Sequence, residues 1–256
     1  MKLKLLASNF RPMTAVMNPS LAEMEAEKRA GIVFVHVGKC AGGSVMKALR
    51  RGLTRNHAMF ELHTRNANQL LRETLFGTQK EFTYLIALRD PISRFVSAFN
   101  WDKHRFFLNE KTRAPYVKPF FEEFRTADML ACALSSDDSD KAARALEFSR
   151  FGHMGMGQGW YVPADVVTAL PKARTWLCET ERLAEDLQNF AAAMDERYAK
   201  RRLEVGHDKA EFTAGYDNRD ELFSKKLSVE GRRNLRILLN DDYRSQRLLK
   251  QRFGRR

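Results

Sequence analysis

The 256-residue chain is poor in cysteine, and its three cysteines, Cys40, Cys132 and Cys178, are odd in number and far apart. This spacing excludes a disulfide framework, and the absence of any CxxC pair excludes a cysteine-based zinc ribbon. No HExxH sequence is present either, so we expect no bound metal. Low cysteine use is typical of a reducing compartment, and we expect a cytoplasmic protein.

The sequence also lacks a long apolar run. The N-terminal stretch, residues 1–10, is far shorter than the ~20 residues that a membrane span needs, and it has no apolar core of a signal peptide. No internal repeat is visible. We therefore expect no membrane span and one soluble domain over residues 1–256, with a helical extension at 1–30 and a basic tail at 251–256.

Acidic residues are in the minority. The chain has 44 Lys and Arg against 32 Asp and Glu, a net charge of +12, and residues 225–256 hold 11 of the basic and 3 of the acidic residues. Such an excess favours anionic partners, such as nucleotides, acidic glycans or nucleic acid. Because no RNP, zinc-finger or helix-turn-helix signature is present, we expect no nucleic-acid partner.

Strand patterns alternate with helix patterns along the chain. The first strand is a continuous run of β-branched and aromatic residues, which is typical of a parallel strand buried on both faces. The alternation predicts an α/β fold with a parallel sheet. The predicted elements are strands at 32–37, 82–88 and, weakly, 175–178, helices at 20–30, 44–51, 92–101, 120–134, 141–151, 181–198 and 228–249, and a flexible glycine-rich loop at 152–159.

A glycine-containing loop follows the first predicted strand and reads Gly38-Lys-Cys-Ala-Gly-Gly-Ser44. Parallel sheets bind ligands at the carboxyl ends of their strands. Glycines let backbone N–H groups approach an anion, and the following helix adds the favourable end of its dipole. The loop is not a Walker A sequence, because its lysine precedes the glycine pair. We interpret it as a phosphate cradle; the alternative is an ordinary turn between strand and helix.

A second candidate anion site follows the next predicted strand. Arg89 ends that strand, and Ser93 and Ser97 lie one helical turn apart in the helix that Asp90 and Pro91 begin. With Arg94, these groups offer a guanidinium fork and hydroxyls to an anion. The alternative is an amphipathic helix whose phenylalanines only pack. Two such sites on one sheet suit a ligand that carries phosphates at two separate places.

The order and wording of the two motifs resemble the sulfotransferases that use 3′-phosphoadenosine 5′-phosphosulfate (PAPS). Residues 34–45 are similar to their 5′-phosphosulfate loop, typically F-I-H-x-P-K-T-G-G-T-S, and residues 88–99 to their 3′-phosphate motif, R-D-P-x-x-R-x-x-S. The nearest branch is the carbohydrate sulfotransferases of the Golgi type and their soluble bacterial relatives. The resemblance implies a P-loop-NTPase-like three-layer fold, with a central parallel sheet flanked by helices.

The resemblance also implies a reaction and its ligands. A sulfuryl group would pass from PAPS to a hydroxyl of a carbohydrate or glycan by in-line displacement, leaving PAP, with no metal. Gly38 replaces the usual proline, and Cys40-Ala41 replaces Thr-Gly, so Cys40 would put a thiol near the sulfuryl group. The residues that the resemblance assigns to PAPS are Gly38, Lys39, Cys40, Ala41, Gly42, Gly43, Ser44 and Val45 for the 5′-phosphosulfate, and Arg89 and Ser97 for the 3′-phosphate.

Sulfuryl transfer needs charge stabilisation and a base. We expect Lys39 to neutralise the leaving phosphate oxygen. A general base must also take the proton of the acceptor hydroxyl. His63 is our first candidate, because uronyl-type relatives place a catalytic histidine in a similar segment, and Glu61 is the alternative. His153 would contact the acceptor, and His36 would be structural because it lies in the first strand.

Two other functions stay open at this point. A nucleotide-dependent phosphotransferase of the P-loop type would share the fold, although the Walker A sequence is missing. A basic nucleic-acid-binding protein would explain the net charge but not the two motifs.

Overall fold

The computed structural model of the protein describes residues 18–53, 55–206 and 211–254. Its four strands form one parallel sheet in the order β2-β1-β3-β4. The predicted α/β class is therefore confirmed. The strands are β1 (Ala30–Val35), β2 (His57–Leu62), β3 (Phe82–Leu88) and β4 (Thr175–Glu179).

Helices make up most of the rest of the chain. The helices of ten residues or more are α2 (Gly42–Gly52), α3 (Ala67–Phe76), α4 (Pro91–Lys103), α7 (Ser139–Phe148), α11 (Leu183–Met194), α14 (Val229–Leu238) and α15 (Asn240–Phe253). The shorter ones are α1 (Leu21–Ala26), α5 (Lys118–Glu123), α6 (Ala127–Ala133), α8 (Gly152–Gly155), α9 (Gln158–Tyr161), α10 (Ala164–Ala169), α12 (Arg197–Lys200) and α13 (Arg219–Leu222). Single turns of other helical types are η1 (His104–Leu108), η2 (Pro115–Val117), η3 (Lys172–Arg174), η4 (Thr180–Arg182) and η5 (Glu211–Thr213).

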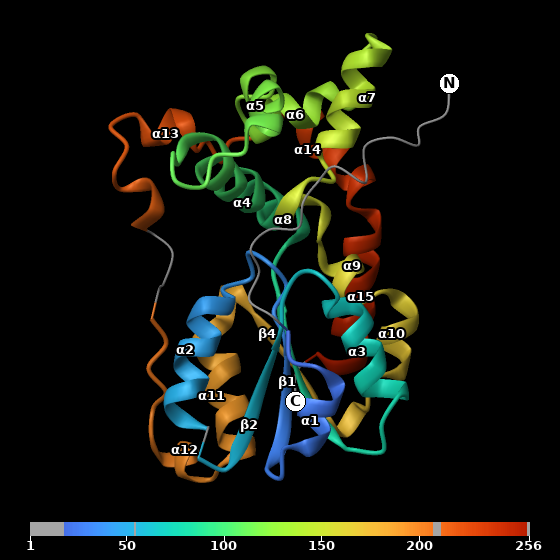
Figure 1. Ribbon diagram of the computed structural model, residues 1–256, viewed down its shortest axis with the longest axis vertical. Helices are drawn as coiled ribbons and strands as arrows, with labels where there is room; N and C mark the ends of the chain where they lie inside the picture. The colour runs from blue at the N-terminus through green and yellow to red at the C-terminus, as the bar shows by residue number, and fades with distance from the viewer. Residues whose placement is uncertain (1–17, 54, 207–210, 255–256) are drawn as a thin grey trace.

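The sheet is the middle of three layers. Helices α2, α11 and α12 cover one face, and α1, α3, α10 and α15 cover the other (Figure 1). Strands β1 and β3 lie inside the sheet, and from Ile32 to Val35 no β1 residue is more than 1% exposed. A central strand enclosed by helices on both faces needs apolar side chains in both directions, which explains its unbroken hydrophobic run.

A separate group of helices lies beyond the carboxyl ends of the strands. There α4, α5, α6, α7, α13 and α14 gather above the sheet (Figure 1). They have a hydrophobic core of their own, in which Phe99, Phe121 and Phe148 are fully buried. The carboxyl edge of the sheet, where α/β proteins bind ligands, therefore faces this helical part.

The structure corrects several predicted boundaries. The helix expected at 20–30 is capped by Ser20 and Glu23, but it ends at Ala26, and Gly31 lies inside β1. The helices expected at 120–134, 181–198 and 228–249 are each interrupted, at Phe124, Asp195 and Leu239, where the backbone leaves the helical region. Strand β2 and helix α3 were not predicted. Along β2, buried and partly buried side chains do not alternate regularly, so this strand has no clear period of two.

Two predictions about flexible segments also change. The glycine-rich stretch 152–159 is not a flexible loop but contains α8 and α9, in which His153 and Gln158 are buried. The expected basic tail at 251–256 belongs to α15 as far as Phe253, which is only 6% exposed. Its last two residues, 255–256, lie outside the described part of the chain. No helix in the described residues is long and apolar enough to cross a bilayer.

Candidate active site

The loop between β1 and α2 is wound tightly. Lys39 and Ala41 both have left-handed backbones, with φ of 70° and 57°, and the Cys40 amide donates to the carbonyl oxygen of Val37 over 3.1 Å. Left-handed backbone in non-glycine residues is costly and clusters at functional sites. This curl brings the chain directly into α2 at Gly42.

The start of α2 has the properties of an anion site. Ala41 occupies the N-cap position, no side chain caps the helix, and its first turn has no acidic residue. The N–H groups of the first turn of a helix attract anions when a side chain does not satisfy them. The predicted phosphate residues Gly43 and Ser44 lie in this turn, whereas the side chain of Val45 is fully buried in the core.

Gly42 is required by the neighbouring histidine. A Cβ atom added at Gly42 would lie 1.8 Å from Nε2 of His36. The ring of His36 is fixed from its other side, because Nδ1 lies 2.6 Å from Oε1 of Glu61. Oε2 of Glu61 lies 3.8 Å from the guanidinium of Arg50. Glu61, one of the two predicted bases, is therefore bound to His36.

Lys39 is nearly enclosed, with 6% of its surface exposed. Its Nζ lies 4.3 Å from the centre of the Trp101 ring and 5.8 Å from that of Phe212. Trp101 lies one turn beyond Ser97 on α4, so both occupy the helix face that is turned toward the loop lysine. This cation–π contact holds the ammonium group between the loop and the helix that carries the second motif.

The two predicted anion motifs meet in the structure. Nη1 of Arg89, at the end of β3, donates to the carbonyl oxygen of Lys39 over 3.2 Å. The carbonyl oxygen of Arg89 accepts hydrogen bonds from the side chains of Gln158 and Gln246, at 2.9 and 3.1 Å. The first bond joins the end of β3 to the loop after β1, from which it is 50 residues away in sequence, and the other two join it to α9 and α15.

Arg94 does not face this site, which corrects its interpretation as an anion ligand. Its side chain is fully buried, and its guanidinium donates to the carbonyl oxygens of His153 and Met154, at 2.7 and 3.0 Å. It also lies 3.7 Å from the carboxylate of Asp242. On the same helix, Ser93 is exposed and Ser97 is half-buried.

Cys40 is buried among apolar side chains and belongs to the main hydrophobic core. Burial raises the pKa of its thiol to about 12, although the nearby Arg94 and Arg89 guanidinium groups act in the opposite direction. A protonated, enclosed thiol is a poor nucleophile. The cysteine that stands here in place of the usual threonine therefore packs into the hydrophobic core beneath the loop.

Three histidines from three different segments lie in a row beside the loop. The rings of His36 and His63 stack with centroids 4.0 Å apart, and those of His63 and His153 lie 6.0 Å apart. Gly38 lies between the last two: a Cβ there would be 2.9 Å from Cδ2 of His153 and 3.7 Å from Cε1 of His63. Nδ1 of His63 lies 2.9 Å from the carbonyl oxygen of His36.

His153 is paired with a residue that the sequence analysis missed. Nδ1 of His153 lies 2.7 Å from Oδ1 of Asp102, and its backbone N–H donates to Oδ2 over 2.8 Å. The Asp102 side chain is fully buried. A sequence signal was present, since Asp102 falls three residues after Phe99 and seven after Phe95, on the buried face of α4.

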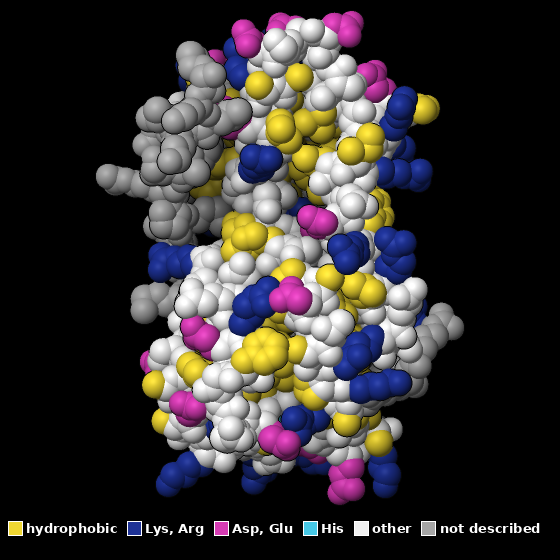
Figure 2. Space-filling model, turned by 90° about the vertical axis from the view of Figure 1, so that its right-hand side faces the viewer, with side chains coloured by type: hydrophobic (Ala, Val, Ile, Leu, Met, Phe, Trp, Pro, Cys, Tyr) yellow, Lys and Arg dark blue, Asp and Glu magenta, His cyan; other side chains and the backbone are white. Residues whose placement is uncertain are grey.

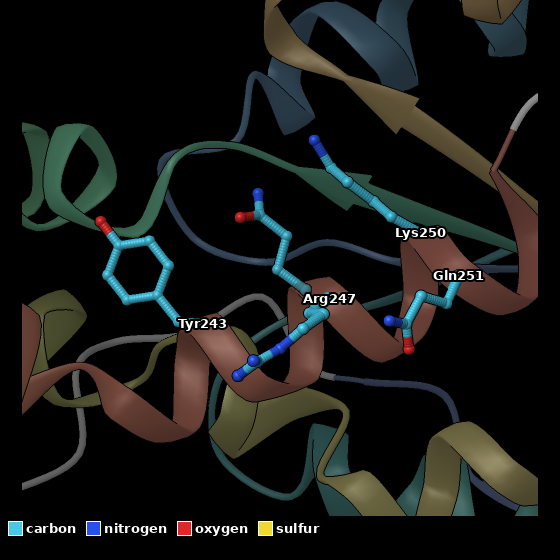
Figure 3. A pocket seen from close by; sticks show the side chains of 5 residues that line it. Tyr243, Arg247, Lys250 and Gln251 are labelled. Atoms are coloured by element: carbon cyan, nitrogen blue, oxygen red, sulfur yellow. The ribbon is translucent and has the colours of Figure 1, made fainter.

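A surface groove lies apart from this loop. It has a volume of about 640 Å³ and runs along α15, where it is lined by Tyr243, Gln246, Arg247, Lys250 and Gln251 (Figure 3). Its lining does not include the loop after β1. It touches the site only through Gln246 and through Tyr243, whose hydroxyl lies 3.3 Å from Asp90.

Basic side chains do not form one continuous patch on the visible side of the molecule. Figure 2 shows Lys and Arg spread over this face, with Asp and Glu side chains between them. In the described residues no group of three or more His, Cys, Asp or Glu side chains is placed to hold a metal ion.

Comparison with known proteins shows the family of the chain. Residues 23–245 match the sequence profile of the Sulfotransferase family, and the match includes β1, the loop, β3 and α4. The chain therefore belongs to the sulfotransferase family, and it is a sulfotransferase enzyme with an α/β fold. A search of the curated proteins found no match.

Proposed function

We propose that this enzyme transfers the sulfuryl group of PAPS to a hydroxyl of a carbohydrate, by in-line displacement. The reaction converts R–OH and PAPS into R–OSO₃⁻, PAP and a proton. The observation that carries the proposal is the hydrogen bond between Arg89 and the carbonyl oxygen of Lys39, which joins the two candidate anion motifs at one edge of the sheet. Family membership supports the same chemistry.

The donor set suits a nucleotide with phosphate groups at two places. The uncapped first turn of α2, with Gly42, Gly43 and Ser44, would hold the 5′-phosphosulfate. Arg89 and Ser97 would hold the 3′-phosphate. PAPS, when bound, supplies a sulfuryl group attached to a phosphate that can leave. This arrangement favours PAPS over ATP, because the Walker A order is absent from the loop.

Lys39 would stabilise the charge that forms on the departing phosphate oxygen. Its ammonium group is almost removed from water by Trp101 and Phe212. Electrostatic stabilisation is stronger in such a water-poor place than at an exposed one. Lys39 would thus act in the transition state and not only in binding.

The proton of the acceptor would pass to one of two imidazoles, those of His63 and His153, which lie on either side of Gly38. Glu61 would act indirectly, because its carboxylate is bound to His36. We therefore propose that Glu61 orients His36 and that the base is one of the two histidines.

A carbohydrate acceptor is favoured by the resemblance to carbohydrate sulfotransferases and by the aromatic side chains around Lys39. Trp101 and Phe212 meet edge to face, with centroids 5.3 Å apart, and Tyr216 lies beside Phe223. Trp101 and Phe212 are half-buried, and an aromatic side chain of this kind offers a large apolar surface for contact with a ligand. The net charge of +12 favours an acceptor that is itself anionic.

The first experiment is a thermal shift series with PAP, AMP, ATP and a UDP-sugar, with and without Mn²⁺. A ligand at 100 times its dissociation constant adds about 2.7 kcal/mol to the free energy of unfolding. For a chain of this length that is a rise of roughly 5–10 °C. We expect PAP to give this shift without metal and AMP, which has no 3′-phosphate, to give much less.

Two variants make the experiment specific. Arg89→Met should remove most of the difference between PAP and AMP, because it removes the proposed 3′-phosphate ligand. Arg232→Met, an exposed arginine on α14, is the matched control and should bind PAP as the wild type does. A shift with ATP or with Mn²⁺ and UDP-sugar, but not with PAP, would contradict the proposal. A PAP shift leads directly to an acceptor screen with ³⁵S-labelled PAPS and acidic polysaccharides.

A further inference from the structure

We propose that Gln158 and Gln246 are positioning residues for PAPS, because they hold Arg89 in the place where its guanidinium would take the 3′-phosphate. The inference rests on the proposed function, in which Arg89 is a ligand of that phosphate. The two glutamines belong to neither anion motif and lie 69 and 157 residues from Arg89 in sequence. They come from α9 and α15, and they would act only through the arginine.

Arg89 is held at its backbone and at its side chain. Its carbonyl oxygen accepts hydrogen bonds from Nε2 of Gln158 and from Nε2 of Gln246, over 2.9 and 3.1 Å, so both of its lone pairs are used. Its Nη1 donates to the carbonyl oxygen of Lys39 over 3.2 Å. A guanidinium has five N–H donors and this bond uses one of them, so others can bind a phosphate without a change of position. The glutamines therefore fix the root of a side chain whose tip contacts the loop after β1.

Gln158 lies in surroundings that would suit an apolar side chain. It is fully buried, and its Oε1 has no hydrogen-bond partner within the described part of the chain. A buried acceptor left unpaired costs free energy, which leucine or methionine at this place would avoid. What glutamine supplies and these residues do not is the N–H donor to Arg89. Packing alone does not explain this residue, whereas the need for a fixed Arg89 does.

Gln246 lies on the face of α15 that is bound to the ends of two strands. On the same face, Tyr243 and Lys250 bind the carboxylates beyond β3 and at the end of β4, at 3.3 and 2.5 Å. In Figure 3 these two side chains point to one side of the helix, and Gln251 points to the other. The helix is thus anchored before and after Gln246. This anchoring sets the distance that the glutamine spans to Arg89.

The test replaces Gln246 with methionine, which has a similar length and no N–H donor. Gln246 is half-buried and lines the groove along α15, so this variant is expected to fold. Gln251→Met is the matched control, because Gln251 lines the same groove from the other side of the same helix. The readouts are the Kd values of PAP and AMP by titration calorimetry, KM and kcat with PAPS, and the melting temperature without ligand.

We expect Gln246→Met to raise the Kd of PAP by about 2–10-fold, the effect of one hydrogen bond, and to leave the Kd of AMP unchanged. AMP has no 3′-phosphate for Arg89 to bind. KM for PAPS should rise while kcat stays near the wild-type value, because the contact is the same in the ground state and the transition state. Gln251→Met should change none of these values.

Gln158→Met should act in the same direction as Gln246→Met. The double variant should raise the Kd of PAP by more than the product of the two single effects, because each glutamine alone still holds the carbonyl oxygen of Arg89. Gln158→Met thus provides a second measurement on a separate helix.

The Arg89→Met background separates positioning from stability. There Gln246→Met should have no further effect on the Kd of PAP, because no guanidinium is left to be positioned. A purely structural role of Gln246 would lower the melting temperature and weaken PAP and AMP alike, in both backgrounds.

Three results would overturn the assignment: a double variant that binds PAP as the wild type does, an equal loss of affinity for PAP and AMP, or the same loss of PAP affinity in the Arg89→Met background. Failure of the proposed function looks different. In that case the wild type itself would bind PAP no more tightly than AMP, which is measured before any glutamine is replaced.

Discussion

Nη1 of Arg94 lies 2.7 Å from the carbonyl oxygen of His153, so the second motif contributes its buried arginine to the fold and not to an anion. The same guanidinium lies 3.7 Å from Asp242 on α15. One side chain of α4 thereby fixes α8 and faces the last helix. The stretch that carries His153 owes its position to this arginine.

Arg94→Met should therefore destabilise the protein strongly. It leaves the buried Asp242 carboxylate without its cation and two carbonyl oxygens without donors, and loss of one partner of a buried ion pair costs about 3–5 kcal/mol. Ser93→Ala, one residue earlier and exposed, should change the free energy of unfolding by less than about 0.5 kcal/mol. Urea unfolding measures both, and equal stability of the two variants would contradict this role.

Lys39→Met should abolish most sulfuryl transfer. If Lys39 stabilises the leaving phosphate, its loss should lower kcat by roughly 10²–10³-fold, as for the loss of one charge-stabilising donor at other active sites. Lys47→Met, exposed on α2, is the matched control and should keep its turnover. Release of ³⁵S-sulfuryl from PAPS is the measurement. Similar rates in both variants would exclude Lys39 from the transition state.

Gly42→Ala should damage the loop, because the new Cβ would lie 1.8 Å from His36 Nε2. Overpacking a well-packed place costs typically about 1–3 kcal/mol. We expect a lower melting temperature and a weaker PAP shift, since His36 or the first turn of α2 must move. Gly215→Ala meets no atom within 4 Å and should leave both values unchanged. Normal PAP binding by Gly42→Ala would show that the loop tolerates the displacement.

Native thiol labelling should modify one cysteine. Burial raises the pKa of Cys40 to about 12 and that of Cys178 well above its usual value, whereas Cys132 is half-exposed. At pH 8 we expect iodoacetamide to label Cys132 and to reach the other two only after unfolding, as read by peptide mass spectrometry. Rapid labelling of Cys40 in the folded protein would contradict its place in the core.

The same shift predicts how stability changes with pH. The unfolded chain ionises its thiols near pH 8.5, whereas folded Cys40 keeps its proton until about pH 12. Below pH 8.5 both states are protonated and the thiol has no effect on stability. As the pH rises above 8.5, ionisation of the thiol stabilises the unfolded state, so the free energy of unfolding should fall. In the Cys40→Ala variant the free energy of unfolding should fall less steeply.

Elements with local signals could be predicted from the amino-acid sequence. The apolar run of β1, the β3 strand at 82–88 and the N-cap at Asp90 follow from residue type and short spacing. Strand β3 has its predicted bounds, and α4 begins at Pro91, one residue before its predicted start. The loop after β1 and Arg89 could also be chosen from the sequence as candidate anion ligands. Few residue types suit an anion site at the carboxyl end of a parallel strand.

Which of these groups contact one another depends on the packing of distant segments. The sequence favours Arg94 as a ligand and gives no partner for His153, since the Asp102 that orients it lies 51 residues away. It also makes 152–159 a loop, because glycine permits many backbones and only packing against Asp102 and Arg94 selects one. Whether a polar side chain binds a ligand or fixes the fold depends on what faces it across the core, and local sequence does not contain that information.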